Sequence, residues 1–169
     1  MGGATTDVYS AHREVTEVGT VLRGLPEPEI KRTVEGDLGM RVSAEATAHV
    51  GGSAYAAALA AQGVTESQLK AHAAMLTQAP DFLPCSNEDK SLDTLLAGLC
   101  VGHAAARHVG RWLPVFTPEG EVQVQTGRNL THVGKIIGSG GWLSRADDFE
   151  PADWFAAHAI DARGRRVLM

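Results

Sequence analysis

Two short glycine-rich segments carry the residue types that bind phosphate groups. The first, Gly2-Gly3-Ala4-Thr5-Thr6-Asp7, leads directly into the strand-like run Val8-Tyr9-Ser10. Consecutive small residues let backbone N–H groups converge on an anion. The threonine hydroxyls can donate to phosphate oxygens, and the aspartate can reach a metal ion or its water. The pattern predicts a phosphate-binding loop, although a Gly/Thr cluster alone is also typical of a flexible segment.

The second segment, residues 135–142, reads Lys-Ile-Ile-Gly-Ser-Gly-Gly-Trp. An apolar run that ends in small residues lets a ribose or a planar ring approach the backbone closely. One such segment is weak evidence, but two in this order favour a split α/β nucleotide-binding fold. Because a loop of the first kind normally lies between two strands and only Met1 precedes it, we expect the chain to be part of a larger protein.

A third candidate lies at Glu35 and Asp37, which flank Gly36. Two residues apart on an extended chain, their carboxylates would face the same side. They would then contact a metal-bound water or a ribose near the nucleotide. The alternative is a polar turn in which the neighbouring glycines only set the backbone angles. The residues alone leave both interpretations open.

Composition narrows the class of protein. The chain has 169 residues, 44% hydrophobic and 21% charged, which is typical of one globular domain with a real core. Its net charge of −5 argues against nucleic-acid binding. We expect Cys85 and Cys100 to be buried and reduced, and the absence of a signal peptide or a long apolar run predicts a cytoplasmic location with no membrane contact.

The periodicity predicts strands at both ends and helices between them. Residues 5–10 and 14–18 alternate like a hairpin, and residues 31–42 form a third extended stretch. A capping box at Thr65-Glu66-Ser67-Gln68 predicts one helix start, and the segment from Ser86 to Asp89 predicts a second. The second helix carries a stripe of leucines and ends before Gly110, where Arg107 and His108 would act as cations at its C-terminus.

After this helix the pattern predicts a β-hairpin around Pro118-Glu119-Gly120, a strand that enters Gly138, and a helix over residues 152–160. Seven histidines invite a metal hypothesis, but His103 and His108 are five residues apart and do not share a helix face. We expect His103 to be a packed, hydrogen-bonded core residue, and we do not expect a zinc site.

Four segments together resemble one known family. They are residues 2–8, the run Lys31-Arg32-Thr33-Val34-Glu35-Gly36-Asp37-Leu38-Gly39-Met40-Arg41, the segment Gly127-Arg128-Asn129-Leu130-Thr131 and residues 137–141. In this order they resemble the MutL/GlmL-type proteins associated with glutamate mutase and ornithine aminomutase. That family is similar to the actin–Hsp70–sugar-kinase ATPases. It also carries an aspartate just before the first glycine pair and an N-terminal lobe, and this chain has neither.

The resemblance implies an α/β fold, an RNase-H-like (actin-like ATPase) lobe over residues 1–43 and 113–169 with a helical insert over 44–112. It implies ATP or ADP and Mg²⁺ as ligands, with Asp7 as the catalytic and metal-binding residue. The residues implied to contact the nucleotide are Gly2, Gly3, Ala4, Thr5, Thr6, Glu35, Asp37, Gly138, Ser139, Gly140 and Gly141.

The function implied is that of an ATP-binding accessory or reactivating chaperone of an adenosylcobalamin-dependent aminomutase, of which this chain is a fragment. The full-length parent would be ATPase-like and the fragment inactive alone. The alternative is a non-catalytic interaction or dimerisation module that binds nucleotide weakly or not at all. Because its first strands lack a covering neighbour, we also expect the chain to form a homo-oligomer.

Overall fold

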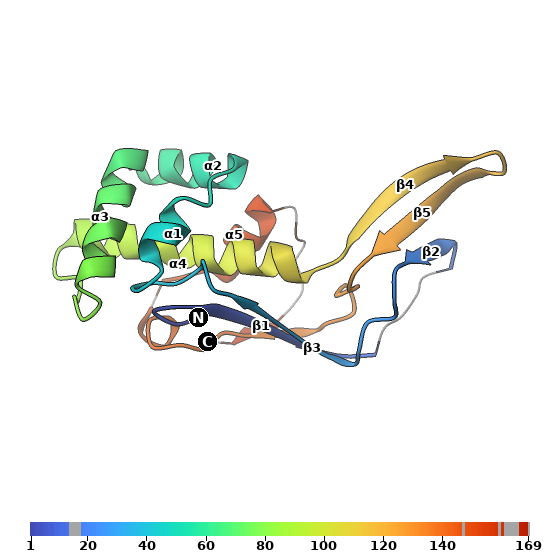
Figure 1. Cartoon of the computed structure of the whole chain (residues 1–169), viewed down its shortest axis with the longest axis horizontal. Coiled ribbons are helices and arrows are strands. Elements are labelled where there is room, and N and C mark those ends of the chain that lie inside the picture. The colour runs from blue at the N-terminus through green and yellow to red at the C-terminus, as the bar shows by residue number, and fades with distance from the viewer. Residues whose placement is uncertain (14–17, 147, 159, 161–165, 169) are drawn as a thin grey trace.

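The chain forms a helical and β-stranded body from which a β-sheet arm projects. Figure 1 presents the computed structural model, which describes residues 1–13, 18–146, 148–158, 160 and 166–168. The helices are α1 (Ala44–Ala48), α2 (Ser53–Gln62), α3 (Glu66–Gln78), α4 (Asn87–His108) and α5 (Pro151–Ala157), with a 3₁₀ turn η1 (Leu143–Arg145). The strands are β1 (Thr6–Ala11), β2 (Thr20–Arg23), β3 (Ile30–Glu35), β4 (Arg111–Thr117), β5 (Gly120–Thr126), β6 (Lys135–Ile137) and β7 (Arg166–Leu168).

Helix α4 is the longest element and runs through the middle of the body, as Figure 1 shows. Its start is fixed by a capping box, in which the Asp89 amide donates to Ser86 Oγ at 3.0 Å and the Ser86 amide donates to Asp89 Oδ2 at 3.1 Å. Thr65 and Gln68 cap α3 in the same way. Both predicted helix starts are therefore confirmed, because these boxes are made by residues three apart in sequence.

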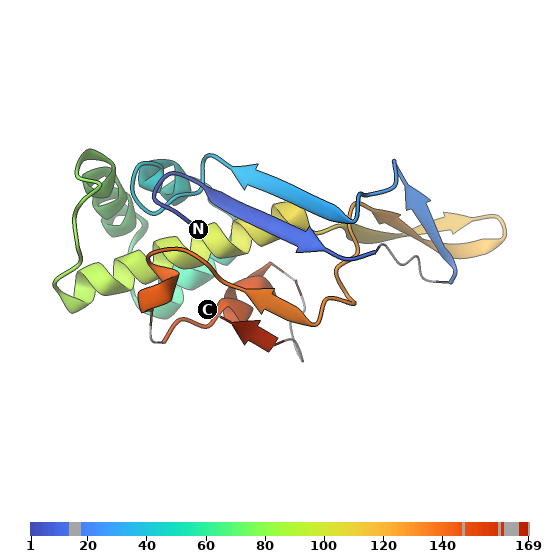
Figure 2. The same cartoon turned by 90° about the horizontal axis from the view of Figure 1, so that it is seen from below.

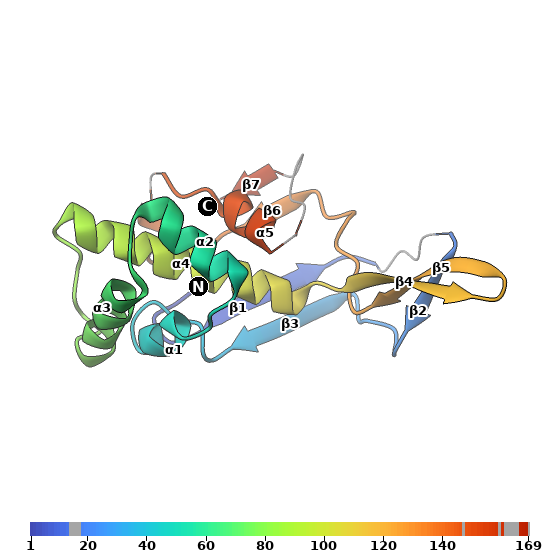
Figure 3. The same ribbon diagram turned by 90° about the horizontal axis from the view of Figure 1, so that it is seen from above.

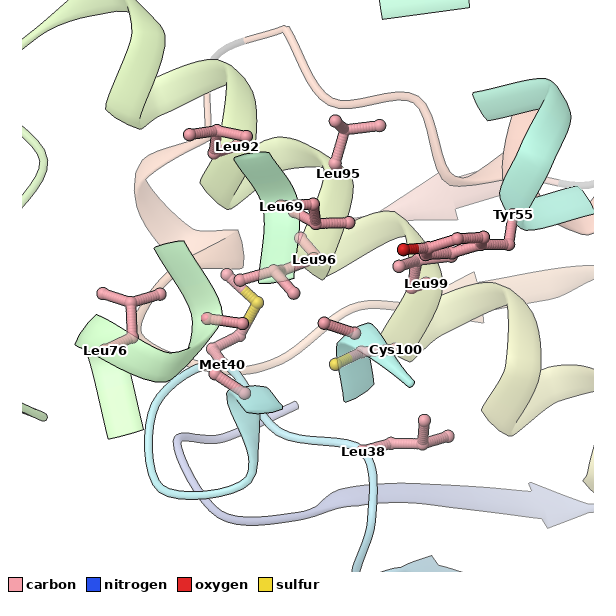
Figure 4. Close-up of a cluster of buried hydrophobic side chains, with 14 of the residues drawn as sticks. Leu38, Met40, Tyr55, Leu69, Leu76, Leu92, Leu95, Leu96, Leu99 and Cys100 are labelled. Atoms are coloured by element: carbon pink, nitrogen blue, oxygen red, sulfur yellow. The ribbon is translucent and has the colours of Figure 1, made fainter. Parts of the chain in front are cut away.

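The hydrophobic core lies where α1, α2 and α3 pack against α4 (Figure 4). Leu92, Leu95, Leu96 and Leu99 of α4 are buried, as the predicted stripe requires. They meet Leu38 and Met40 from the segment after β3, Tyr55 from α2, and Leu69, Ala73 and Leu76 from α3. The segment from residue 38 to residue 40 is thus anchored in the core.

In the described part of the chain the strands form three small sheets. β1 pairs antiparallel with β3, β5 lies between β2 and β4, and β6 pairs parallel with β7. The architecture is mixed α/β, as predicted. The predicted hairpin at Pro118 to Gly120 is confirmed by the β4–β5 pairing, and so is the strand that enters Gly138.

The predicted pairing of residues 5–10 with residues 14–18 stays a prediction, because residues 14–17 lie outside the described residues. The partner that the structure gives β1 is β3, with Thr6 opposite Glu35 and Ala11 opposite Ile30. A cross-strand ion pair supports this register, since Arg32 Nη2 lies 2.9 Å from Asp7 Oδ1. Diagonal contacts between opposite charges of this kind stabilise a strand pair.

His108 joins the end of α4 to this sheet. The side chain is buried, and its Nε2 and Nδ1 atoms hydrogen-bond Ser10 Oγ at 2.8 Å and Thr33 Oγ1 at 3.0 Å. Burial lowers the pKa of His108 to about 4, with a further contribution from Lys31. The prediction that His108 is a cation at the helix end is therefore wrong, because the fold buries the ring as a neutral polar link.

Two further predictions concern single side chains. Cys100 is buried and burial raises the pKa of its thiol to about 11, whereas Cys85 is exposed, which corrects the prediction that both are buried. His103 is packed edge-on against His158 with ring centroids 4.4 Å apart, but its Nε2 atom has no hydrogen-bond partner among the described residues.

No helix in the described part of the chain is long and apolar enough to cross a membrane.

We predict that the chain loses stability as the pH falls from about 6.5 to about 4. The unfolded chain takes up a proton on His108 over this window while the folded chain does not, so protonation favours unfolding. The pKa of His103 is also lowered to about 4, and this histidine adds to the same slope. Urea unfolding at several pH values measures the effect. A His108→Gln variant should show a flatter profile over this window, and an unchanged slope would contradict the assignment.

Candidate nucleotide groove

The first glycine-rich loop is held by backbone hydrogen bonds rather than left free. The Gly2 amide donates to the Thr5 carbonyl at 2.8 Å and closes a turn. The carbonyls of Gly2 and Gly3 accept from the amides of Met40 at 3.0 Å and Arg41 at 2.8 Å. The loop therefore lies directly against the segment that follows β3, which is itself anchored in the core.

Gly39 makes this close approach possible. A Cβ atom added at Gly39 would lie 2.6 Å from the Gly3 carbonyl oxygen and 2.7 Å from the Ala4 carbonyl carbon. Ser43 adds a side-chain contact, since its Oγ donates to the Ala4 carbonyl at 2.7 Å. The two segments touch through their main chains, so only glycine fits at position 39 without a shift.

The predicted phosphate-binding side chains already have partners in this structure. Thr6 is buried and its Oγ1 donates to the Leu38 carbonyl at 2.9 Å. Thr5 Oγ1 donates to Asp7 Oδ2 at 3.4 Å, and Asp7 Oδ1 accepts from the Arg32 guanidinium. A metal ion at Asp7 would have to compete with this ion pair.

The second glycine cluster contacts the start of the chain. The Met1 ammonium donates to the Ser139 carbonyl at 2.7 Å. At Gly140, where φ is +139°, an added Cβ would clash with the Met1 carbonyl oxygen. The fold thus brings together the two glycine-rich segments that the sequence singled out, although 138 residues separate Met1 from Ser139.

A groove of about 1150 Å³ begins at this junction. Of the predicted site residues, Thr6, Asp7, Gly138 and Ser139 line it. Gly2, Gly3, Ala4, Thr5, Gly140 and Gly141 belong to the adjoining loops but do not line it. Its other walls include β1, β6, α5 and the loop over residues 128–133, and residues Val101, Ala104 and Ala105 of α4 form part of the lining.

Glu35 and Asp37 lie elsewhere and do not line this groove. Arg107 at the end of α4 binds both, with its Nη1 atom 2.7 Å from Glu35 Oε2 and 2.6 Å from Asp37 Oδ1. The Arg107 guanidinium lowers the pKa of Asp37, and both carboxylates raise the pKa of Arg107. The carboxylates of Glu35 and Asp37 do face the same side, as predicted, but what they bind there is the Arg107 guanidinium. Their contact with nucleotide stays a prediction.

Sequence reasoning missed a buried charged network beneath the first loop. Asp93 of α4 is fully buried, and its carboxylate lies 2.8 Å from Arg41 Nη2 and 3.1 Å from His72 Nε2. Arg41 is the residue whose amide holds Gly3. The only signal in the sequence was an acidic residue beside the leucine stripe of α4, and that signal does not identify its partners.

It also missed the role of Arg128, which lies in one of the four family segments. The side chain is buried and donates to the carbonyls of His12 at 3.0 Å and Glu29 at 2.6 Å, and to the Pro28 carbonyl. Arg128 therefore joins the chain after β1 to the chain before β3. In the same loop, Asn129 Oδ1 accepts from the Thr131 amide at 2.9 Å.

These residues fit one side of a magnesium–nucleotide site. Mg²⁺ is commonly held by one or two carboxylates together with substrate phosphates, and Asp7 supplies one carboxylate at the groove. Glycine at 138 allows close approach of a ring or a ribose. The described residues contain no group of three His, Cys, Asp or Glu side chains that would hold a metal by themselves.

The chain is a mixed α/β protein in which the loop before β1 and the loop after β6, both rich in glycine, meet at one groove. Comparison with known proteins gives its family. The chain belongs to the MutL protein family, which it matches over residues 1–168. It is 38% identical over 162 residues to Protein MutL of Clostridium tetanomorphum. That match covers 95% of this chain but only 34% of the relative, so the chain spans about a third of that protein. No solved structure matches the chain significantly.

We predict that Gly39→Ala destabilises the chain and loosens the first loop. The added methyl group would meet two backbone groups of residues 3 and 4, so we expect a loss of about 1–3 kcal/mol in the free energy of unfolding. Gly36→Ala is the matched control, because a Cβ there has nothing within 4 Å and its φ is not positive. Urea unfolding of both variants tests this, and equal stabilities would contradict the packing described.

Proposed function

We propose that this chain supplies one side of the nucleotide site of an ATP-binding accessory protein. The observation that supports this is the meeting of the two glycine-rich segments at one end of the groove, where Met1 contacts Ser139 and Asp7 lies nearby. Asp7 would orient Mg²⁺, and Gly138 and Ser139 would border the adenosine. When bound, the magnesium–nucleotide would supply the phosphoryl group, and its negatively charged phosphates would lie against the first glycine-rich loop.

We further propose that the chain is the greater part of an RNase-H-like lobe of the actin-like ATPase type. The antiparallel β1–β3 pair, the parallel β6–β7 pair and the helices between β3 and β4 support this. In such proteins two lobes close over the nucleotide. The relative is about three times as long as this chain, which leaves room for a second lobe with its own phosphate loop.

The partner we propose is an adenosylcobalamin-dependent aminomutase of the glutamate mutase type. This part of the proposal is supported by membership of the MutL family and by the resemblance of the four segments described above. Closure of two lobes over nucleotide changes the angle between them. That motion is a means of releasing damaged cofactor from a partner enzyme, which is what a reactivating protein must do.

A second candidate function is an interaction or dimerisation module, and the arm formed by β2, β4 and β5 favours it. Figure 3 shows this arm projecting from the body. Its exposed large apolar side chains are Val21, Trp112, Leu113, Val115 and Phe116, and Phe116 is 80% exposed. Exposed apolar strands of this kind commonly pack against another protein surface. Both functions are compatible in a protein that binds nucleotide at one end and a partner at the other.

We predict weak nucleotide binding by the chain alone. Only one side of the phosphate site is present, so Mg-ATP should bind with a Kd above about 1 µM, the affinity that corresponds to roughly 8 kcal/mol. Hydrolysis should be undetectable. Isothermal titration calorimetry and a phosphate-release assay measure both, with the mass determined alongside because a dimer can supply further ligands. Submicromolar binding by a monomer would contradict the proposal.

In the full-length parent protein, we predict that Asp7→Ala lowers the rate of hydrolysis and that Gly140→Leu lowers the affinity for nucleotide. A carboxylate that orders the metal acts mainly on the transition state, so Asp7→Ala should lower kcat at least tenfold with little change in nucleotide affinity. Gly140→Leu should lower affinity instead, because the larger side chain disturbs the junction with Met1. Asp81→Ala, an exposed acid outside the groove, is the control. Wild-type behaviour of both site variants would exclude this site.

A further inference from the structure

The groove is also a gap between two strand edges. Figure 2 shows the strands in the spatial order β3, β1, β6, β7, with β1 and β6 on either side of the gap. Within the described residues, β1 pairs only with β3 and β6 pairs only with β7. The edge of β1 that faces β6 and the edge of β6 that faces β1 therefore lack strand partners there. Unpaired backbone edges of this kind are templates for another strand.

Two contacts join the segments at the two ends of the gap. At one end Met1 donates to the Ser139 carbonyl at 2.7 Å, and at the other His12 Nε2 lies 2.6 Å from the Asn129 carbonyl. The segments 1–12 and 129–139 therefore run antiparallel to each other. In Figure 2 the arrows of β1 and β6 accordingly point in opposite directions. Between the two contacts the strands are separate.

The lining of the gap suits a buried strand. Val101, Ala104 and Ala105 of α4 contribute small apolar side chains to it, and Ile136 and Phe155 add larger ones. A strand of six residues is about 20 Å long, the length of β1 beside which it would lie. Small side chains on the helix leave room for the side chains of an additional strand, and no charged residue of α4 lines the gap.

We propose that an extended apolar strand inserts between β1 and β6, antiparallel to β1 and parallel to β6. It joins the two small sheets into one sheet of five strands, β3–β1–inserted strand–β6–β7. The occupant is a segment of the MutL polypeptide beyond the third that this chain spans in its relative. Because the inserted strand runs against β1, its carboxyl end reaches the end of the groove where Asp7 and Ser139 lie.

The test is hydrogen–deuterium exchange of the chain with a peptide probe, acetyl-Lys-Val-Val-Ile-Val-Lys-amide, without nucleotide. Main-chain hydrogen bonds provide most of the affinity in strand addition, so a generic apolar strand is a suitable probe. We expect saturable protection of both β1 and β6, with exchange at least tenfold slower in each. The same peptide with alternate backbone nitrogens methylated cannot donate to the edges, and it should give no protection.

A matched pair of variants locates the site. Ala105 and Ala106 are neighbours on α4 and both are half-buried, but Ala105 lines this groove and Ala106 lines a smaller pocket on another side of the helix. Ala105→Trp should abolish the protection, and Ala106→Trp should keep it. Three results would overturn the proposal: no protection, protection only at the edges of β2 or β4, or slow exchange of β1 and β6 without any peptide. None of these depends on nucleotide binding.

Discussion

The organisation of the site depends on a direct contact between two backbone segments, residues 2–4 and residues 39–41. The contact is possible because position 39 is glycine, and it fixes the first loop to a segment whose side chains Leu38 and Met40 are in the core. Because no flexible side chain lies between the two backbone segments, they have little freedom to move relative to each other. The loop that enters β1 is therefore attached to the core through this segment.

The buried charges extend this constraint to the helices. Arg41 holds the Gly3 carbonyl through its amide and Asp93 through its guanidinium, and Asp93 also contacts His72 of α3. Breaking a buried ion pair by removing one partner leaves an uncompensated charge, so such networks specify one arrangement strongly. At the other end of α4, His108 links the helix to β1 and β3. Helix α4 thus fixes the position of the β1–β3 pair relative to the core.

The parts of this fold that could be predicted from the sequence are those set by neighbours in the chain. The caps at Thr65 and Ser86, the leucine stripe of α4 and the β4–β5 hairpin depend on residues a few positions apart. The partner of β1 depends instead on contacts such as Asp7 with Arg32, 25 residues away. The environment of Glu35 and Asp37 is set by Arg107, some 70 residues further on, and no local pattern indicates it. The two glycine-rich segments were recognised because their composition is unusual, but their contact through Met1 and Ser139 required the fold.

The central claim is that these two segments form one side of a single nucleotide site. Photolabelling of the full-length parent protein with 8-azido-ATP and Mg²⁺, followed by peptide mapping, tests it most directly. The account predicts labelled peptides from the β6 end, around residues 135–145, with labelling suppressed by excess ATP and weakened when the Gly140 junction is disturbed. Labelling confined to the arm or to the helices α1–α3, or labelling that ATP does not suppress, would contradict it.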